Sequence, residues 1–370
     1  MTQRTTAPPY SAARVDAVPG LIPPEPRGGR ASRTVMRSLT HHAKEALVAG
    51  DGGADWRLFS DEGDYFGGTD LAPPPLGLFG AGLAASYAGG LRALAARRGI
   101  AADSLRVTED SVYTTEGSAL RGTIQGGALP VEVRVDGPDA LRALAQEAVA
   151  ASPVDGLLRR ALTARFALYL NGERIPTGDE APEIDGPALD DPILLFDQAV
   201  DGAGGTEPLV VKVEDDAEPE QPLADDEAPR ADGQARRPHA RAVCAPRDDG
   251  LLVIDEHLFQ PPGSHFRMLA DEDGPRAPDA LSYVSAGLAF CYATQVIRYA
   301  QLTKLHVNGC RLIQDLRLGP GDDVEPPETH LYLDSTENAD AARRIMAMGR
   351  RMCFLHALCG TALDVHIGAG

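Results

Sequence analysis

This chain of 370 residues has few basic residues, few aromatic residues and no cysteine in its first half. The chain has 35 Lys and Arg and 54 Asp and Glu, which gives a net charge of −19. This charge argues against nucleic acid or an anionic membrane as a binding partner, because both attract proteins through basic side chains. No run of about 18 apolar residues is present, so we expect no membrane-spanning segment. The first residues lack an apolar h-region, which predicts a cytoplasmic chain without a signal peptide, where thiols stay reduced.

All five cysteines lie in the second half of the chain, and they are Cys244, Cys291, Cys310, Cys353 and Cys359. An odd, one-sided set in a cytoplasmic chain does not predict a framework of structural disulfides. Each cysteine is therefore either a small apolar core residue or a thiol with a chemical role.

Two stretches have the composition of disordered chain. Residues 1–32 are rich in Pro, Gly, Ala and Arg without apolar periodicity, which predicts a disordered N-terminal tail. Residues 173–240 predict an acidic linker rich in Pro and Ala, because positions 213–227 hold eight acids and no base. The apolar island at 193–196 could dock on a domain.

A short apolar motif occurs twice, 205 positions apart, at positions 81–87 (AGLAASY) and 286–292 (AGLAFCY). Each copy lies in a predicted long apolar helix, which two strands, a further helix and a last strand follow. This order predicts a tandem duplication and an α+β fold, with long buried helices packed against antiparallel sheets. Aligning the copies places Ser86 opposite Cys291 and Ser152 opposite Cys353.

These features resemble the OsmC/Ohr superfamily of osmotically inducible and organic hydroperoxide resistance proteins. The resemblance rests on Gly67-Gly68, the three prolines at 73–75, the apolar helix and two strands after them, and Ser152-Pro153-Val154. It covers residues 56–172 and, with a more divergent sequence, 241–368. It implies an intramolecular pseudo-dimer of two fused units, which are residues 33–172 without cysteine and residues 241–370 with Cys291 and Cys353.

In that family a first cysteine on the central helix attacks an organic hydroperoxide, and a second cysteine resolves the sulfenic acid as a disulfide. The resemblance therefore implies Cys291 as the attacking thiol and Cys353 as the resolving thiol. It also implies a dithiol or lipoyl protein as the reductant, with no cofactor. Arg267 is the cation that we assign to this site. An apolar pocket for the hydroperoxide is expected from Phe290, Tyr292, Met352 and Phe354.

Local electrostatics leaves the order of attack open. A helix N-terminus stabilises a thiolate, and Cys353 would have one whereas Cys291 in mid-helix would not. The best-known members of the family have a Glu ten residues before the first cysteine, where this chain has Leu281. Further candidate cations are Arg33, Arg37 and Arg276.

Other functions also stay open. A binding protein that kept the fold and lost the chemistry would account for Leu281 and for the serines of the first unit. A transferase with Cys291 as nucleophile would need a Cys–His pair, which the sequence does not reveal. A metal site at Cys353-x-x-His356-x-x-Cys359 would fan three ligands around a short helix, so we expect no metal there. Whether the fused chain forms a further homodimer is also open.

Overall fold

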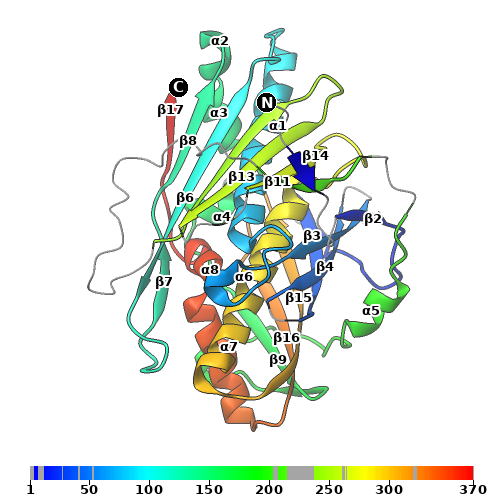
Figure 1. Ribbon diagram of the computed structural model, residues 1–370, viewed down its shortest axis with the longest axis vertical. Coiled ribbons are helices and arrows are strands. Elements are labelled where there is room, and N and C mark those ends of the chain that lie inside the picture. Colours follow the sequence, from blue (N-terminus) through cyan, green and yellow to red (C-terminus); the bar gives the residue numbers. More distant parts are fainter. Residues whose placement is uncertain are drawn as a thin grey trace.

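The computed structural model describes residues 4–6, 12–26, 28–40, 42–51, 54–202, 207–214, 237–260, 263, 265–319 and 323–369. The fold is α+β, with two large sheets and two long helices between them (Figure 1). The core lies where these helices meet the inner faces of the sheets.

The first sheet has nine strands, eight of which follow one another in the order β1-β11-β14-β13-β12-β6-β8-β17, while β7 pairs with β6. Their bounds are β1 Arg4–Thr6, β6 Arg106–Glu116, β7 Gln125–Ala128, β8 Val131–Asp136, β11 Val210–Glu214, β12 His239–Pro246, β13 Leu252–Gln260, β14 His265–Ala270 and β17 Val365–Ala369.

The second sheet has eight strands in the order β10-β9-β16-β15-β3-β4-β5-β2. Their bounds are β2 Ala13–Val15, β3 Arg30–Ser38, β4 Lys44–Gly50, β5 Asp55–Ser60, β9 Arg165–Leu170, β10 Glu173–Ile175, β15 Val307–Leu318 and β16 Glu328–Ser335.

The helices are α1 Pro75–Arg97, α2 Asp139–Arg142, α3 Ala145–Ala150, α4 Gly156–Arg159, α5 Ile193–Gln198, α6 Ala280–Thr303, α7 Ala339–Met352 and α8 Phe354–Cys359, with short 3-10 turns at Asp64–Phe66 and Gly178–Glu180. The two longest, α1 and α6, are the helices that carry the repeated motif.

Each sheet takes strands from both halves of the chain. In the first sheet β12–β14 of the second half pair through β12 with β6 of the first half. In the second sheet β3–β5 of the first half pair through β3 with β15 of the second half. The edges match as well, because β17 pairs in parallel with β8 and β9 pairs in parallel with β16. Neither half could therefore keep its sheet intact without the other.

The repeated motif supplies the contact between the two long helices. A Cβ atom on Gly82 of α1 would lie 2.6 Å from the Val284 side chain, and one on Gly287 of α6 would lie 2.8 Å from the backbone nitrogen of Phe79. Only glycine allows backbones to approach this closely. The motif is therefore a helix-crossing motif, and both of its copies face each other in the core.

Helix α6 is long and apolar enough to cross a membrane by length and composition, although polar residues interrupt its apolar sequence. Its most apolar part is 94% buried inside the protein. Such burial between two sheets accounts for an apolar composition on nearly every side.

The predictions of a disordered tail over residues 1–32 and of a linker over 173–240 are wrong for much of both segments. Val15 and Leu21 of the tail and Ile184 and Phe196 of the linker are buried against the outer face of the second sheet. Strand β11 extends the first sheet through β14. A few apolar anchors are enough to order these polar stretches once a sheet face is present. Residues 215–236, which include most of the acidic run, lie outside the described residues.

Candidate active site

Cys291 and Cys353 lie side by side in the core. Cys291 is in the middle of α6, and Cys353 is the residue between α7 and α8, where it caps the N-terminus of α8. Their sulfur atoms are 3.3 Å apart, and their exposed fractions are 2% and 0%. Two thiols 62 positions apart in the chain are thus in direct contact. All five cysteines are reduced and buried.

The two sulfurs have different electrostatic surroundings. Burial and the adjacent Cys291 raise the pKa of the Cys353 thiol well above its usual value, although the backbone N–H groups of His356 and Leu355 oppose that shift. The Cys353 S–H donates to the Cys291 sulfur. Cys353 is therefore held protonated, and its S–H points at the Cys291 sulfur, which accepts the hydrogen bond.

Cys353 also contacts a histidine that the sequence did not reveal as its partner. His356 Nδ1 is 3.3 Å from Cys353 Sγ, and the imidazole packs against the rings of both Tyr292 and Phe166. Burial, together with the positive charge of Arg350, lowers the pKa of His356 to about 3. A Cys–His pair is present after all, with a neutral imidazole and with Cys353 in place of Cys291.

Lys44 is a buried basic residue near Cys291, and sequence reasoning missed it. It is fully buried on β4 of the first half, within electrostatic range of Glu62, Asp61 and Cys291. Its Nζ donates to the carbonyl of His42. Burial lowers the pKa of Lys44, and the negative charges of Glu62, Asp61 and Cys291 oppose that shift without cancelling it. A fully buried lysine is rare enough in proteins to mark a functional position.

Glu62 supplies an acidic group from the loop after β5. Its carboxylate accepts hydrogen bonds from Thr294 Oγ1 at 2.9 Å and from the Tyr65 hydroxyl at 3.0 Å. Thr294 lies one turn after Cys291 on α6. Burial raises the pKa of Glu62, and Lys44 lowers it. An acid is therefore present near Cys291 although position 281 is leucine.

A small cavity opens beside Cys291. It is lined by side chains of both halves, namely Glu62, Tyr65, Phe66, Pro74, Pro75, Leu76, Pro238, Leu258, Cys291, Gln295 and Phe354. Of the four predicted pocket residues, Phe354 lines this cavity. Phe290, Tyr292 and Met352 are buried in the core, and the Tyr292 hydroxyl donates to the Met346 carbonyl. The prediction failed for these three because six of the eleven lining residues come from the loop before α1 and from the start of α1, in the other half.

Arg267 does not belong to this site, and its prediction as the catalytic cation is wrong. Alternate residues of a strand face opposite sides, and Phe266 and Met268 of β14 face the core. Arg267 therefore lies on the other face of the sheet, where its Nε donates to Asp255 at 2.8 Å. The other candidate cations also have carboxylate partners: Arg33 pairs with Asp315, Arg37 with Glu45 and Arg276 with Asp271.

Ser86 and Ser152 form a matching pair in the first half. Their hydroxyl oxygens are 2.7 Å apart in the core. Next to them the Tyr87 hydroxyl donates to Asp155 at 3.1 Å, and Asp155 is three residues after Ser152 just as His356 is three residues after Cys353. The alignment of serines with cysteines thus corresponds to two pairs of adjacent side chains in space.

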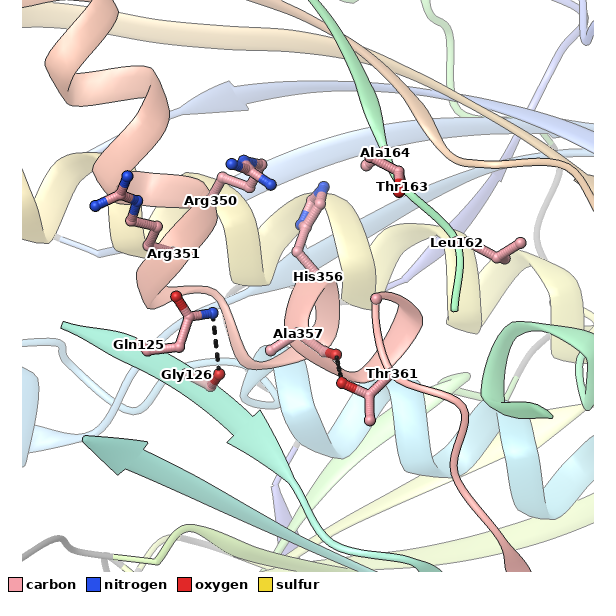
Figure 2. A pocket seen from close by; sticks show the side chains of 11 residues that line it. Gln125, Gly126, Leu162, Thr163, Ala164, Arg350, Arg351, His356, Ala357 and Thr361 are labelled. Atoms are coloured by element: carbon pink, nitrogen blue, oxygen red, sulfur yellow. Dashed lines mark hydrogen bonds between the residues drawn. The ribbon is translucent and has the colours of Figure 1, made fainter. Parts of the chain in front are cut away.

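A second cavity lies beside His356 and is shown in Figure 2. Its walls come from the end of α7, from α8 and the turn after it, from the start of β7 and from residues 162–164. Within the described residues, no group of three or more His, Cys, Asp or Glu side chains converges as a metal site.

No family model matches the chain, and no curated protein matches it. Among solved structures, it is similar to the crystal structure of an OsmC-like hydroperoxide resistance protein from Jannaschia sp. CCS1. The identity is 25%, the match covers 30% of this chain and 79% of that one, and the TM-score is 0.19. A superposition this limited carries no weight for mechanism, so the function has to be argued from the residues of this chain.

Proposed function

We propose that the protein is a thiol-dependent peroxidase that reduces organic hydroperoxides through Cys291 and Cys353. The observation that carries this proposal is the contact of the two sulfurs at 3.3 Å, beside a buried lysine and an apolar cavity. A hydroperoxide with a fatty or aryl group fits the lining of that cavity better than hydrogen peroxide does.

The reaction consumes one hydroperoxide and two thiols. The Cys291 thiolate attacks the distal peroxide oxygen, the O–O bond breaks, and the alkoxide takes a proton and leaves as an alcohol. Cys291 is then a sulfenic acid. Cys353 attacks its sulfur, water leaves, and a disulfide joins the two cysteines. A dithiol or lipoyl protein reduces this disulfide by thiol exchange and is itself oxidised to a disulfide.

Electrostatics supports Cys291 as the attacking residue, although a helix N-terminus alone would favour Cys353. The attacker must be a thiolate. Lys44 lies in electrostatic range of Cys291, and the Cys353 S–H donates to it. Cys353 keeps its proton because burial and the neighbouring sulfur raise its pKa. This difference between the two cysteines is consistent with Cys291 as the attacking thiol and Cys353 as the resolving thiol.

We also propose that the chain is an intramolecular pseudo-dimer that arose by duplication. The pairings that join the halves correspond between the two sheets, β12–β6 with β3–β15 and β17–β8 with β9–β16. Two ion pairs correspond as well. Arg33 of β3 donates to Asp315 of β15 at 2.8 Å, and Arg241 of β12 donates to Asp110 of β6 at the same distance. Asp110 and Asp315 are 205 positions apart, which is also the spacing of the repeated motif.

Thiol counting tests the peroxidase. Reduced protein mixed with one equivalent of tert-butyl hydroperoxide should lose two thiols within minutes, and Cys291→Ser should lose none. Cys310→Ser is the matched control, because Cys310 is a buried cysteine outside the pair and its loss should leave the result unchanged. Unaltered thiols in the wild-type protein would instead favour a binding protein that kept the fold without the chemistry.

A further inference from the structure

The cavity beside His356 has an unusual charge for this protein. The chain carries a net charge of −19, yet this cavity is lined by Arg350, Arg351 and His356, and no Asp or Glu is among the described residues that line it. Figure 2 shows both arginine side chains extending from the end of α7, with His356 on the neighbouring helix. Gln125 of β7 adds an amide to the wall.

The two arginines bond only to backbone carbonyls in the part of the chain that the structure describes. Arg350 Nη2 donates to the Glu180 carbonyl at 3.2 Å, and Arg351 Nη1 donates to the Gly122 carbonyl at 3.3 Å. A carbonyl carries no net charge, so these contacts hold the side chains in position without neutralising them. Two guanidinium groups with fixed positions and remaining donors form a binding site for a planar or tetrahedral anion.

Two buried polar atoms at this cavity have no hydrogen-bond partner within the described residues. They are His356 Nε2 and Arg350 Nε. His356 has an exposed fraction of only 6%, and its other nitrogen is occupied by the contact with Cys353. Buried polar atoms are normally satisfied, and leaving one unpaired costs about 1–3 kcal/mol. A ligand in the cavity would satisfy both atoms.

We propose that this cavity binds a small molecule through a carboxylate or phosphate group, which Arg350, Arg351 and His356 hold. The guanidinium groups donate to the anion's oxygens. For His356 to donate to the same group from Nε2, its Nδ1 must accept the Cys353 S–H, which turns from the Cys291 sulfur to Nδ1, each 3.3 Å from Cys353 Sγ. The imidazole of His356 would therefore separate the bound anion from Cys353. The anion would occupy a different cavity from the apolar one beside Cys291.

The position of the arginines at the end of α7 has a simpler partial explanation. Cations in the last turn of a helix interact favourably with its unpaired carbonyl groups. That effect accounts for basic residues at the C-terminus of α7. It does not account for an unpartnered, buried His356 Nε2 at the wall of the same cavity.

Calorimetric titration of the reduced full-length protein in Tris buffer tests the site, with inorganic phosphate and with propionate as separate probes. We expect saturable binding of at least one probe. The probe that binds more tightly identifies the group as a phosphate or a carboxylate. Arg351→Met should weaken binding at least tenfold, which corresponds to the loss of one charge-assisted hydrogen bond.

Arg344→Met is the matched control, because it removes the same charge from an exposed position of α7 and should change the affinity less than twofold. The His356 side-chain resonances should shift during the wild-type titration, which needs no variant to fold. Absence of saturable heat with both probes, or equal weakening by Arg344→Met, would overturn the proposal. Binding is measured without peroxide, so these outcomes are independent of the proposed peroxidase.

Discussion

The cysteine pair and the serine pair lie at corresponding places in the two halves, but among the described residues only the cysteine pair has a fully buried lysine near it. The registers of β3–β4 and β12–β13 place Leu252 where the other half has Lys44. The half with the cysteine pair thus has Lys44 at this position, and the half with the serine pair has Leu252 there. A buried lysine is costly unless a negative group compensates it, and a hydroxyl pair has no such charge to offer.

The acid, in contrast, is present in both halves. Glu62 and Glu272 are each the second residue after the last strand of their hairpin. Glu62 accepts a hydrogen bond from Thr294, whereas a Cβ atom at the corresponding Gly89 would lie 2.7 Å from the Glu272 side chain. Glu272 accepts instead from the backbone N–H of Ala280. The comparison indicates that the carboxyl group has a structural role near the helix in both halves, while the buried lysine accompanies the cysteine pair alone.

Lys44→Met sharpens this comparison most strongly. Removing the buried amine should slow the peroxide-dependent loss of thiols by roughly one to two orders of magnitude, because the basic group near the Cys291 sulfur is lost. Stopped-flow measurement of the second-order rate constant with tert-butyl hydroperoxide, from pH 5 to 9, gives this quantity.

Leu252→Met is the control for that variant, since it changes the corresponding position of the serine half and preserves its volume. It should leave both the rate constant and its pH dependence unchanged. Equal slowing by the two variants would mean that Lys44 acts through packing.

Glu109→Gln tests a second difference between the halves. Glu109 is fully buried on β6, Oε2 has no partner among the described residues, and burial raises the pKa of the carboxyl to about 8; the corresponding residue of β15 is Gln314. Because the pKa of Glu109 is higher in the folded than in the unfolded state, the contribution of Glu109 to stability is complete below about pH 4.5. That contribution is lost as the pH rises through 8.

The variant should therefore be more stable than the wild type at pH 8, by on the order of 4 kcal/mol, and about equal to it at pH 4.5. Urea unfolding at the two pH values measures the difference. Gln314→Glu is the converse change and should lower stability at pH 8. A constant difference across pH would show that Glu109 does not titrate in this range.

The smallest expected effect comes from rebuilding the cysteine pair in the serine half. Ser86→Cys combined with Ser152→Cys places two thiols where hydroxyls are 2.7 Å apart, but beside Leu252 in place of a lysine. Hydroperoxide should still oxidise two thiols per chain at the wild-type rate. Mass spectrometry of the alkylated protein locates them. Rapid oxidation of the new pair would contradict the requirement for a cation.

Local sequence was sufficient for the elements that depend on neighbours along the chain. The repeated apolar motif marked α1 and α6, and its spacing aligned serines with cysteines. The prediction of a helix N-terminus at Cys353 was also correct. Periodicity and capping are local properties, and they persist wherever the segment packs.

Tertiary structure alone decided which residues surround the sulfurs. Lys44 and Glu62 come from the other half of the chain, because each sheet interleaves strands from both halves. A strand register determines which face of a sheet a side chain occupies, so Arg267 looked suitable by type and lies on the wrong face. The tail and the linker look disordered by composition and order on a sheet face that exists only after folding. These features depend on the pairing of strands that are far apart in the sequence, which no local pattern encodes.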